Sequence, residues 1–373
     1  MPAVFLSDFR SVIPKYKLAQ SDAVERLIEI RLRLNPKLNR SEVEKRIRRF
    51  GLANSKIQSR GTEVKDYTLD LADPEVALEF FNGAQLPLLE ARMSLFEERA
   101  LEVFENWYKD ESARPNHVVH VSCTGYTAPS AAQKTVSKWI ESTQSTSVTH
   151  AYHMGCYASL PAVRIAQGFA LAADSKTPVR IDIAHNELCS LHFDPLTLEP
   201  EQVVVQSLFA DGHIRYSLEN LEPASGFSVE ALHEILVPDS SEQMTWIPTS
   251  THFKMQLSRL VPDSIRMHLK PFVAGLLKRS AYPEGSPIIF AVHPGGPKII
   301  DAVEEILELT PDQTVESHAV LSERGNMSSA TLPHIWQKIL ENKNRASGTY
   351  VVSLAFGPGL TLSGGVYKIC RRQ

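Results

Sequence analysis

The alternation of short apolar runs with amphipathic segments constrains the fold of this chain most strongly. Strand signals occur in HVVHVSC (117–123), SVTHAYH (147–153), VRIDIAHNEL (179–188) and VVVQSLFA (203–210). Helical patterns such as AAQKTVSKWIEST and LPAVRIAQGFALAA lie between them. Strands and helices that alternate in this way are typical of α/β folds with a buried sheet. We therefore predict an α/β protein.

The second half of the chain repeats this alternation after a change of composition near residue 217. The segments ENLEPASGFS and VPDSSEQ are rich in loop-forming residues. They are followed by a helix around 260–281, the strand PIIFAVH (287–293), the helices PKIIDAVEEILEL and SSATLPHIWQKILENK, and the strands YVVSLAFGP and LTLSGGVYKICRR. We expect two α/β halves without a flexible linker, which suits a chain of 373 residues.

Helical patterns dominate residues 20–112, before the first of these strands. One helix is expected over QSDAVERLIEIRLRL, whose apolar residues share a broad face. A second is expected to begin at Ser41, where Ser41 and Glu44 form a capping-box pattern, and to end at Gly51. A third is expected over about 87–107.

Composition excludes several classes of protein. Hydrophobic residues make up 43% of the chain and charged residues 22%, which excludes a disordered or low-complexity protein. A formal charge of −4 gives no reason to expect a nucleic-acid partner. No apolar run approaches the roughly 18–20 residues that a membrane span needs. Asp8 interrupts an N-terminal stretch without a cleavage site, so we expect neither a secretory signal nor a membrane partner.

Cysteine usage predicts free thiols. Cys123, Cys156, Cys189 and Cys370 are far apart and form no CxxC pair. Such spacing is typical of a protein in the reducing cytoplasm, which is the location that we expect. The chain also has no GxGxxG, P-loop or HExxH motif, so we expect no nucleotide cofactor and no metal.

Three residues at the ends of predicted strands or helices are candidates for catalysis. Cys156 in YHMGCYASLPAVRIAQ lies between a strand and a helix, where the helix dipole favours a thiolate; a buried structural thiol is the alternative. His293 in FAVHPGGPKIID ends a strand before a Pro-Gly-Gly turn, or is a structural histidine. Asn326 in ERGNMSSATLPHIW begins a helix, where asparagine is also simply a good cap.

Together the three side chains supply the groups that acyl transfer and carbon–carbon bond formation require. A thiolate can take an acyl group, and an imidazole can act as a base or as a hydrogen-bond donor. An asparagine amide can stabilise a developing enolate or oxyanion without carrying a charge. The sequence therefore predicts a condensing reaction on a covalent thioester.

Four segments resemble those of the type III polyketide synthases, the chalcone synthase family of thiolase-fold condensing enzymes. GCYASLPAVRIA resembles the family's nucleophile segment, VHPGGPKIID its histidine segment, GNMSSATL its asparagine segment, and AFGPGLTLSGGVYKI its GFGPG strand and closing hairpin. The order Cys, His, Asn is also the same. The resemblance implies a five-layered αβαβα thiolase fold of two related halves, 1–225 with the cysteine and 226–373 with the histidine and asparagine. It also implies a homodimer.

The resemblance assigns roles to individual residues. Cys156 would be acylated, while His293 and Asn326 would hold the thioester carbonyl and the enolate. Phe209 in SLFADGH matches the first gatekeeper aromatic, between the access tunnel and the cavity. For the gatekeepers, core packing is the alternative role. The other cavity positions that the resemblance implies are a second gatekeeper at Phe253 or Met255, and a floor at Gly357, Pro358 and Gly359.

Two departures from the family pattern favour long, carrier-bound acyl chains. Ala128 in TGYTAPS replaces a larger residue that reaches across the dimer interface, which suggests a roomier cavity or an additional channel. Gly51, Asn54 and Gln58 stand where the plant enzymes carry a basic cluster for the coenzyme A phosphates.

Residues 35–60 are nevertheless basic, with only Glu42 and Glu44 as acids. A positive surface there would steer an acidic acyl carrier protein to the tunnel, with Arg48 and Arg49 as docking residues. A solvated helix face is the alternative. The basic residues are Lys37, Arg40, Lys45, Arg46, Arg48, Arg49, Lys56 and Arg60.

Within the family the resemblance is closest to stand-alone ketosynthases that form α-pyrone antibiotics of the myxopyronin and corallopyronin type. It lies in HAYHMGCYASLPAVRIA and IAHNELCSLHF. It implies that two β-ketoacyl thioester chains, one on Cys156 and one on its carrier, are joined by a Claisen-type condensation and closed to an α-pyrone. The acyl groups would arrive on acyl carrier protein phosphopantetheine or on coenzyme A, with no further cofactor.

Other functions stay open from the sequence. One is an iterative alkylpyrone or alkylresorcinol synthase that uses malonyl-CoA, and another is a priming enzyme like ketoacyl synthase III. A third, of a different class, is a non-condensing subunit that binds acyl carrier protein. Cys123 and Cys189 are interpreted as buried thiols. The residues that would serve as an auxiliary base, or else as loop partners, are His153, His185, Glu187 and His192.

Overall fold

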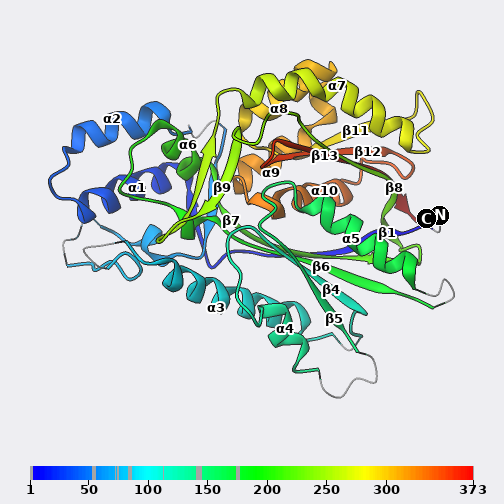
Figure 1. Ribbon diagram of the computed structural model, residues 1–373, viewed down its shortest axis with the longest axis horizontal. Helices are drawn as coiled ribbons and strands as arrows, with labels where there is room; N and C mark the ends of the chain where they lie inside the picture. Colours follow the sequence, from blue (N-terminus) through cyan, green and yellow to red (C-terminus); the bar gives the residue numbers. More distant parts are fainter. Residues whose placement is uncertain are drawn as a thin grey trace.

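Figure 1 shows the computed structural model of the chain, which describes residues 3–52, 56–71, 73, 75–82, 86–111, 113–139, 145–173 and 177–372. Within these ranges nine strands form one large sheet, in the spatial order β11-β12-β13-β8-β1-β7-β6-β4-β5. The strands are β1 (Phe5–Val12), β4 (His117–Ser122), β5 (Ser147–Tyr152), β6 (Arg180–Leu188), β7 (Asp211–Glu219), β8 (Ser225–Leu236), β11 (Ile288–Val292), β12 (Tyr350–Gly357) and β13 (Thr361–Arg371). β1 pairs with both β7 and β8, so it joins the strands of the two halves.

Helices form three layers around the two halves of the sheet (Figure 1). α3 and α4 cover the outer face of the N-terminal strands, and α7 and α8 cover the outer face of the C-terminal strands. α5 and α10 lie between the halves and contact both. This is the five-layered αβαβα thiolase arrangement that the sequence predicts. The helices are α3 (Leu89–Tyr108), α4 (Ala131–Val136), α5 (Ser159–Ala172), α7 (Val261–Arg279), α8 (Pro297–Leu307) and α10 (Thr331–Glu341).

The side chains of β4 show how one strand serves two cores. Val119 and Val121 belong to the central core with α5 and α10. Val118 and His120 lie on the opposite face, where the His120 ring is 4.9 Å from the ring of Phe104 in α3. Because successive side chains of a strand alternate between its two faces, a strand between two helix layers is apolar along most of its length.

Helices α1 (Gln20–Leu34), α2 (Arg40–Phe50) and α6 (Pro200–Leu208) lie together at one end of the molecule (Figure 1). The strand predicted over 203–210 is wrong, because most of this segment belongs to α6. Pro200 stands in the first turn, where its missing N–H has no cost. Val203 packs with Ile28 of α1 and with Val43 and Ile47 of α2, and this packing outweighs the strand preference of three successive valines.

The predicted capping box of α2 is also wrong. The helix begins at Arg40, and the Asn39 side chain accepts a hydrogen bond from the Glu42 N–H at 3.3 Å. Asn39 is therefore the cap, and Ser41 lies inside the first turn. The predicted end at Gly51 is confirmed. Asparagine and serine are both good caps, so the sequence alone does not distinguish the two registers.

Several elements escape the sequence patterns. In β7 apolar and polar side chains alternate, and the polar residues His213, Arg215 and Ser217 are buried because their polar groups have partners. This strand was not predicted from the sequence. β8 begins at Ser225, inside a segment expected as loop. The helix predicted after residue 131 ends at Val136 as α4, and residues 140–144 lie outside the described part of the chain. The remaining elements not predicted are β1, the paired strands β2 (Tyr16–Ala19) and β3 (Ser59–Thr62), the paired strands β9 (Met244–Pro248) and β10 (Phe253–Leu257), and α9 (Val315–Arg324).

The other predicted elements are confirmed within one to five residues at their ends. The strands expected at 117–123, 147–153 and 179–188 are β4, β5 and β6, and the expected C-terminal alternation is present from α7 to β13. The division expected between residues 225 and 226 falls at the first residues of β8. No helix in the described ranges is long and apolar enough to cross a membrane.

Candidate active site

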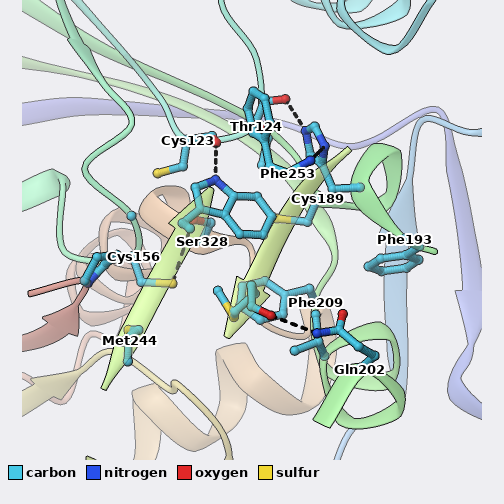
Figure 2. Close-up of a pocket in the computed structure, with 16 residues that line it drawn as sticks. Cys123, Thr124, Cys156, Cys189, Phe193, Gln202, Phe209, Met244, Phe253 and Ser328 are labelled. Carbon is cyan, nitrogen blue, oxygen red and sulfur yellow. Dashed lines mark hydrogen bonds between the residues drawn. The ribbon is translucent and has the colours of Figure 1, made fainter. Parts of the chain in front are cut away.

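A cavity of about 530 Å³ lies where the C-terminal ends of β4, β5 and β6 meet α6 and the β9–β10 hairpin. Cys156 and Ser328 lie at one side of it, and Gln202 and Phe193 lie at the other (Figure 2). Its wall is mainly apolar, with aromatic rings, methionines and thiols. Carboxyl ends of strands are the usual place for a ligand site in α/β proteins, and a hollow of this kind suits an acyl chain.

Cys156 lies in the turn between β5 and α5. Gly155 precedes it with a φ of +81°, and a Cβ there would lie 2.5 Å from Cδ of Pro358. Glycine thus lets the loop after β12 close directly on the cysteine turn. The Cys156 side chain is 7% exposed, and its Sγ lies 3.8 Å from Oγ of Ser328. The predicted nucleophile therefore lines the cavity.

The resting Cys156 is a neutral thiol. Burial raises its pKa to about 12, although hydrogen bonds with Ser328 and Asn326 act in the opposite direction. The nearby carboxylate of Glu187 also raises it. The expectation of a thiolate is therefore wrong for the unliganded protein. Desolvation of a fully buried thiol outweighs the dipole of α5, whose first residue is Ser159.

Backbone and side-chain hydrogen bonds hold Asn326 in place. Its N–H donates to the Leu208 carbonyl at 3.0 Å, and its own carbonyl accepts from the Ala210 N–H at 2.8 Å. Its Oδ1 accepts from the Ser328 N–H at 2.9 Å and from Thr331 Oγ1 at 3.3 Å. These bonds orient the amide, so that Nδ2 is left as a buried donor without a hydrogen-bond partner among the described residues. Nδ2 does not meet the geometric criteria of a hydrogen bond with the Cys156 thiol. The amide is nevertheless close enough to lower the pKa of Cys156.

His293 is a second buried group with free hydrogen-bonding capacity. It follows β11, and its N–H donates to the Leu354 carbonyl of the adjacent strand β12 at 2.8 Å. The side chain is 1% exposed, and neither ring nitrogen has a partner in the described part of the chain. Burial lowers the pKa of this imidazole to about 3, so it is neutral at physiological pH.

The structure brings Cys156, Asn326 and Ser328 together, but it shows no contact between His293 and Cys156. His293 is not among the residues that line the cavity, and lies at the end of the neighbouring strand. Buried polar groups in folded proteins nearly always have partners. The unpaired nitrogens of His293 and Asn326 therefore identify donors and acceptors that are free for a ligand.

The predicted gatekeepers all line the cavity. Phe253 is 1% exposed, and its ring stacks on the His192 ring at 4.3 Å, so it is fixed in the core. Met255 is only half-buried, and its carbonyl accepts from Gln202 Nε2 at 2.8 Å. Phe209 lies at the C-terminus of α6 and forms a backbone bridge to Asn326.

The other predicted substrate-binding residues differ in position. Pro358 lines the cavity, and a Cβ on Gly357 would lie 2.1 Å from the ring of Tyr157, so glycine is required there. Gly359 has a φ of +129°, a conformation that favours glycine. Ala128 is exposed and does not line the cavity of its own chain, and its effect on a cavity across the dimer interface stays a prediction.

Several cavity residues were missed or misread from the sequence. Ser328 was not considered, although it lies two residues after Asn326 in the same motif. Cys123 and Cys189 are buried as predicted, but both also line the cavity. Trp246 of β9 donates its Nε1–H to the Cys123 carbonyl at 2.7 Å and closes one wall. Cys123 directly follows β4, so its place at a strand end was the available signal.

Glu187 is a buried carboxylate next to these thiols. It accepts hydrogen bonds from the Cys123 N–H at 3.0 Å, from Thr124 Oγ1 at 2.7 Å and from Ser329 Oγ. Burial raises its pKa despite these bonds. His192 donates from Nε2 to the Thr124 carbonyl at 2.6 Å and accepts the Phe253 N–H at Nδ1, so its ring is fully used in positioning the wall.

The other candidate bases are also engaged. His153 binds the Trp246 carbonyl through Nε2 at 2.8 Å, although its buried Nδ1 has no partner among the described residues. His185 binds Ser329 Oγ at 3.0 Å. Outside the cavity, the ligand atoms of Asp301, Glu304 and His318 lie within 4.8 Å of one another, as a metal site would require. Glu304 already pairs with His318 at 2.8 Å there.

The proposed docking residues lie on the exposed face of α2. Arg48 pairs with Glu25 of α1, and the Arg49 guanidinium lies 5.2 Å from the Phe50 ring. α2 packs on α6, which lines the cavity, so this face is one helix away from it. Arg60 is not part of the surface, because it is 5% exposed. Asn54 lies outside the described residues.

Comparison with known proteins agrees with this geometry. Residues 229–370 match the family description "Chalcone and stilbene synthases, C-terminal domain". A 1,3,6,8-tetrahydroxynaphthalene synthase of Streptomyces griseus is 27% identical over 286 residues, which cover 74% of this chain and 74% of the relative. A probable polyketide synthase 1 of Dictyostelium discoideum is 27% identical over 87% of this chain, which spans only 10% of that relative.

Solved structures show the same fold. The C-terminal type III polyketide synthase domain of Steely1, a type I/III hybrid from Dictyostelium, superposes with a TM-score of 0.81 at 23% identity, covering 98% of this chain and 99% of that domain. Together, the matched C-terminal domain, the curated relatives and the fold show that this chain is similar to the type III polyketide synthases, which are acyl-transferring condensing enzymes.

Proposed function

We propose that the protein is a ketosynthase that joins two β-ketoacyl thioester chains and closes the product to an α-pyrone. The observation that carries the proposal is a set of buried polar groups without partners: Nδ2 of Asn326, beside the Cys156 thiol, and both ring nitrogens of His293, after β11, have no partner among the described residues. Neutral donors of this kind stabilise an oxyanion that develops only in the transition state.

Acyl transfer would begin with both partners neutral. As the Cys156 sulfur attacks the incoming thioester carbonyl, its proton passes to the imidazole of His293, and the carrier thiol then leaves with that proton. The oxyanion of the tetrahedral intermediate accepts a hydrogen bond from the Asn326 amide. Cys156 now holds the first chain as a thioester, and the carrier is released as a free thiol. This route does not need a preformed thiolate, in keeping with the raised pKa of the Cys156 thiol.

Condensation would use the same groups on the second chain. The carbon between its two carbonyls loses a proton to His293, and the resulting enolate is held by Asn326. The enolate carbon attacks the Cys156 thioester, a carbon–carbon bond forms, and the cysteine sulfur leaves and is protonated by His293. An enol oxygen then attacks the remaining carrier thioester, which gives the lactone and a free carrier thiol. No metal, redox cofactor or malonyl extender is needed.

The iterative use of malonyl-CoA fits the similarity to the type III polyketide synthases equally well and is the second candidate. It would use the same thioester and the same enolate site, but the enolate would arise by loss of carbon dioxide. Similarity to a 1,3,6,8-tetrahydroxynaphthalene synthase favours this candidate. The exposed basic face of α2 favours delivery by an acidic carrier protein in the first candidate. In both candidates we propose a homodimer whose 1–225 half carries Cys156 and whose 226–373 half carries the other two groups.

One experiment separates the candidates. Purified protein is mixed with two different β-ketoacyl thioesters without a malonyl donor, and the products are identified by mass spectrometry. A mixed pyrone that is lost with Cys156→Ala supports the two-chain reaction. Products that appear only after malonyl-CoA is added support the iterative enzyme instead. Cys189→Ala is the matched control, because this thiol also lines the cavity but has no proposed role.

The same protein samples test the non-condensing alternative. Intact-protein mass spectrometry detects acyl groups on the chain after incubation with a thioester. A condensing enzyme gains one acyl group on Cys156 and loses it with Cys156→Ala. Persistent binding of an acylated carrier protein, with no acyl group on Cys156 in the unmodified chain, would point to a binding subunit.

Carrier docking has its own test. Charge reversal with Arg48→Glu and Arg49→Glu should slow turnover of carrier-bound chains about tenfold, because surface charges mainly change the association rate. Turnover of the same chains on coenzyme A should stay unchanged. Arg266→Glu, an exposed arginine on α7, is the control. Equal carrier-dependent rates in all variants would remove the α2 face as a docking site.

A further inference from the structure

A second cavity of about 300 Å³ lies beside the first. Phe193 and Phe209 line both cavities, so the two hollows are separated by these aromatic side chains. In Figure 2, Phe193 lies on the side of the first cavity away from Cys156. Rotation of an aromatic ring would therefore connect the second cavity, which we call the side pocket, with the chamber that contains the thiol.

The wall of the side pocket is mainly apolar. Leu18 of β2 and Ala23 and Leu27 of α1 contribute aliphatic side chains. Tyr67, in the short 3-10 helix η1 (Lys65–Thr68), packs edge-on against the Phe193 ring with 5.7 Å between the centroids. An aliphatic hollow of this size, adjacent to the thioester chamber, fits the distal part of an acyl chain better than a polar metabolite.

The Tyr67 hydroxyl is the exception in this wall. Tyr67 is 4% exposed, and its hydroxyl has no hydrogen-bond partner among the described residues. Burial raises the pKa of this phenol, so it stays protonated and can donate. A buried hydroxyl without a partner costs free energy unless a ligand or a water molecule accepts from it. The side pocket therefore contains a free donor.

The other polar groups of the wall are already engaged. Arg60 donates to Gln20 Oε1 at 2.7 Å and to the Phe209 carbonyl at 2.6 Å, and it forms no ion pair within the described chain. Thr62 donates to Ser190 Oγ at 2.9 Å, and Ser190 donates to the Asp211 carboxylate. The unused group is thus a donor, so the chemistry of the pocket favours a ligand with an acceptor oxygen.

We propose that the side pocket receives the distal end of the acyl chain carried by Cys156, and that a carbonyl or hydroxyl oxygen on this chain accepts a hydrogen bond from Tyr67. The proposal rests on the proposed function, because it requires a chain at Cys156. A polyketide chain meets both demands of the pocket, since it combines carbons that fill the aliphatic wall with oxygens along its length. An ordered water on Tyr67 is the competing occupant.

The hydroxyl is tested by Tyr67→Phe. Two long-chain thioesters of equal length, one with a distal ketone and one without, are offered to the protein, and the rate of Cys156 acylation is measured by intact-protein mass spectrometry. The unmodified chain should acylate faster with the ketone, and Tyr67→Phe should reduce this preference roughly three- to tenfold, as expected for one hydrogen bond. Tyr367→Phe is the matched control, because Tyr367 is also buried with an unpartnered hydroxyl but lines neither cavity.

The hollow itself is tested by Ala23→Leu, which fills it from α1. Long chains should then acylate Cys156 at least about tenfold more slowly, while a two-carbon acyl thioester should react at the unmodified rate, because the first cavity alone holds it. The short chain also reports that the variant has folded with a working thiol. A slower reaction with both chains, together with unchanged Tyr67→Phe behaviour, would contradict the proposal.

The outcomes separate the side pocket from the proposed function. If Cys156 accepts every thioester at rates that neither Tyr67→Phe nor Ala23→Leu changes selectively, the pocket holds water only and this inference fails alone. If no thioester acylates Cys156 in the unmodified chain, the proposed function fails, and the inference fails with it.

Discussion

Burial of Cys156 and His293 changes the protonation states that their sequence motifs suggest. Both groups belong to segments that indicate nucleophilic catalysis, yet the fold holds the thiol at a pKa of about 12 and the imidazole at about 3. The resting thiol and imidazole are therefore both neutral. A thiolate–imidazolium pair would form only when a substrate brings its own partners, so the chemistry is coupled to binding. This coupling protects a buried thiol from reagents that do not fit the cavity.

The alkylation of Cys156 should therefore depend steeply on pH. Below its pKa the thiolate fraction of a thiol rises about tenfold for each pH unit. The rate of reaction of Cys156 with iodoacetamide, followed by peptide mass spectrometry, should keep rising from about pH 7 to 10 without a plateau. A plateau near neutral pH would show that the protein stabilises the thiolate after all. Cys370, which is half-buried and remote from the cavity, gives the comparison within the same sample.

Asn326→Asp should slow the reaction while it keeps the bonds that orient the side chain. The substitution keeps Oδ1 as acceptor for Ser328 and Thr331, but it replaces the free Nδ2 donor with a second acceptor. Loss of one oxyanion donor typically costs about 10²–10³ in rate. Pyrone formation should fall by that factor, whereas Asn326→Ser should lose less because its hydroxyl can donate. Product yields that match the unmodified protein would remove Asn326 from the mechanism.

At the scale of elements, the cavity depends on α6 and its neighbours α1 and α2. Gln202 and Val205 of α6 line one wall, and the opposite face of α6 packs on α2. A segment with three valines thus forms a helix because its packing between the cavity and α2 outweighs the strand preference of valine. The basic face of α2 is consequently held close to the cavity by packing, although no charged group of that face enters it.

The Asn39 cap of α2 gives a prediction at the scale of elements. Removal of an asparagine cap costs about 0.5–2 kcal/mol. Asn39→Ala should therefore lower the free energy of unfolding by about 1 kcal/mol, measured by urea denaturation. Ser41→Ala is the control, because its side chain does not cap the helix, and it should have little effect. A larger loss of stability with Ser41→Ala than with Asn39→Ala would support the capping box that the sequence suggests.

At the scale of the whole molecule, β1 joins the strands of the two halves through its backbone, and its Asp8 belongs to a charge network of the N-terminal half. Arg215 of β7 is fully buried and binds Asp8 of β1 at 2.8 Å, Glu111 after α3 at 2.6 Å and Asp182 of β6 at 3.3 Å. The three carboxylates come from distant parts of the N-terminal half. The Arg215 guanidinium thus offsets the negative charge of three carboxylates that would otherwise repel one another.

Arg215→Ala should destabilise the protein strongly. Removal of one member of a buried ion pair leaves uncompensated charge and typically costs about 3–5 kcal/mol. Arg266→Ala is the matched control, because its pair with Glu305 is more than half exposed and surface ion pairs contribute little to stability. The comparison is made from urea unfolding curves. Equal midpoints for the two variants would mean that the buried network adds little to stability.

The same network predicts a loss of stability in acid. Burial of Glu111 by itself would raise its pKa, but hydrogen bonds from Arg215 and Arg180 lower it below the ordinary value. A carboxyl group with a lowered pKa in the folded state contributes stability that is present above its unfolded pKa, near 4.3. This contribution should disappear as the pH falls from about 4 through the folded pKa. Glu111→Gln should flatten that part of a pH–stability curve.

The sequence by itself determined the fold class, the order of most elements and the identity of the candidate catalytic groups. These properties depend on local patterns: alternating apolar residues at β4, β5 and β6, helical periodicity at α5 and α8, and motif segments around Cys156, His293 and Asn326. β7 was not predicted although its apolar residues alternate, because every second residue is polar and the partners that allow those residues to be buried are distant in sequence.

Only the tertiary structure decided the properties that depend on distant contacts. Val203 became helical because α1 and α2 offer it a packing site, and the Cys156 thiol is neutral because other elements remove it from water. Ser328, Cys123 and the side pocket became visible through proximity alone. Desolvation and packing act between groups that are close in space, so no pattern along the chain can report them.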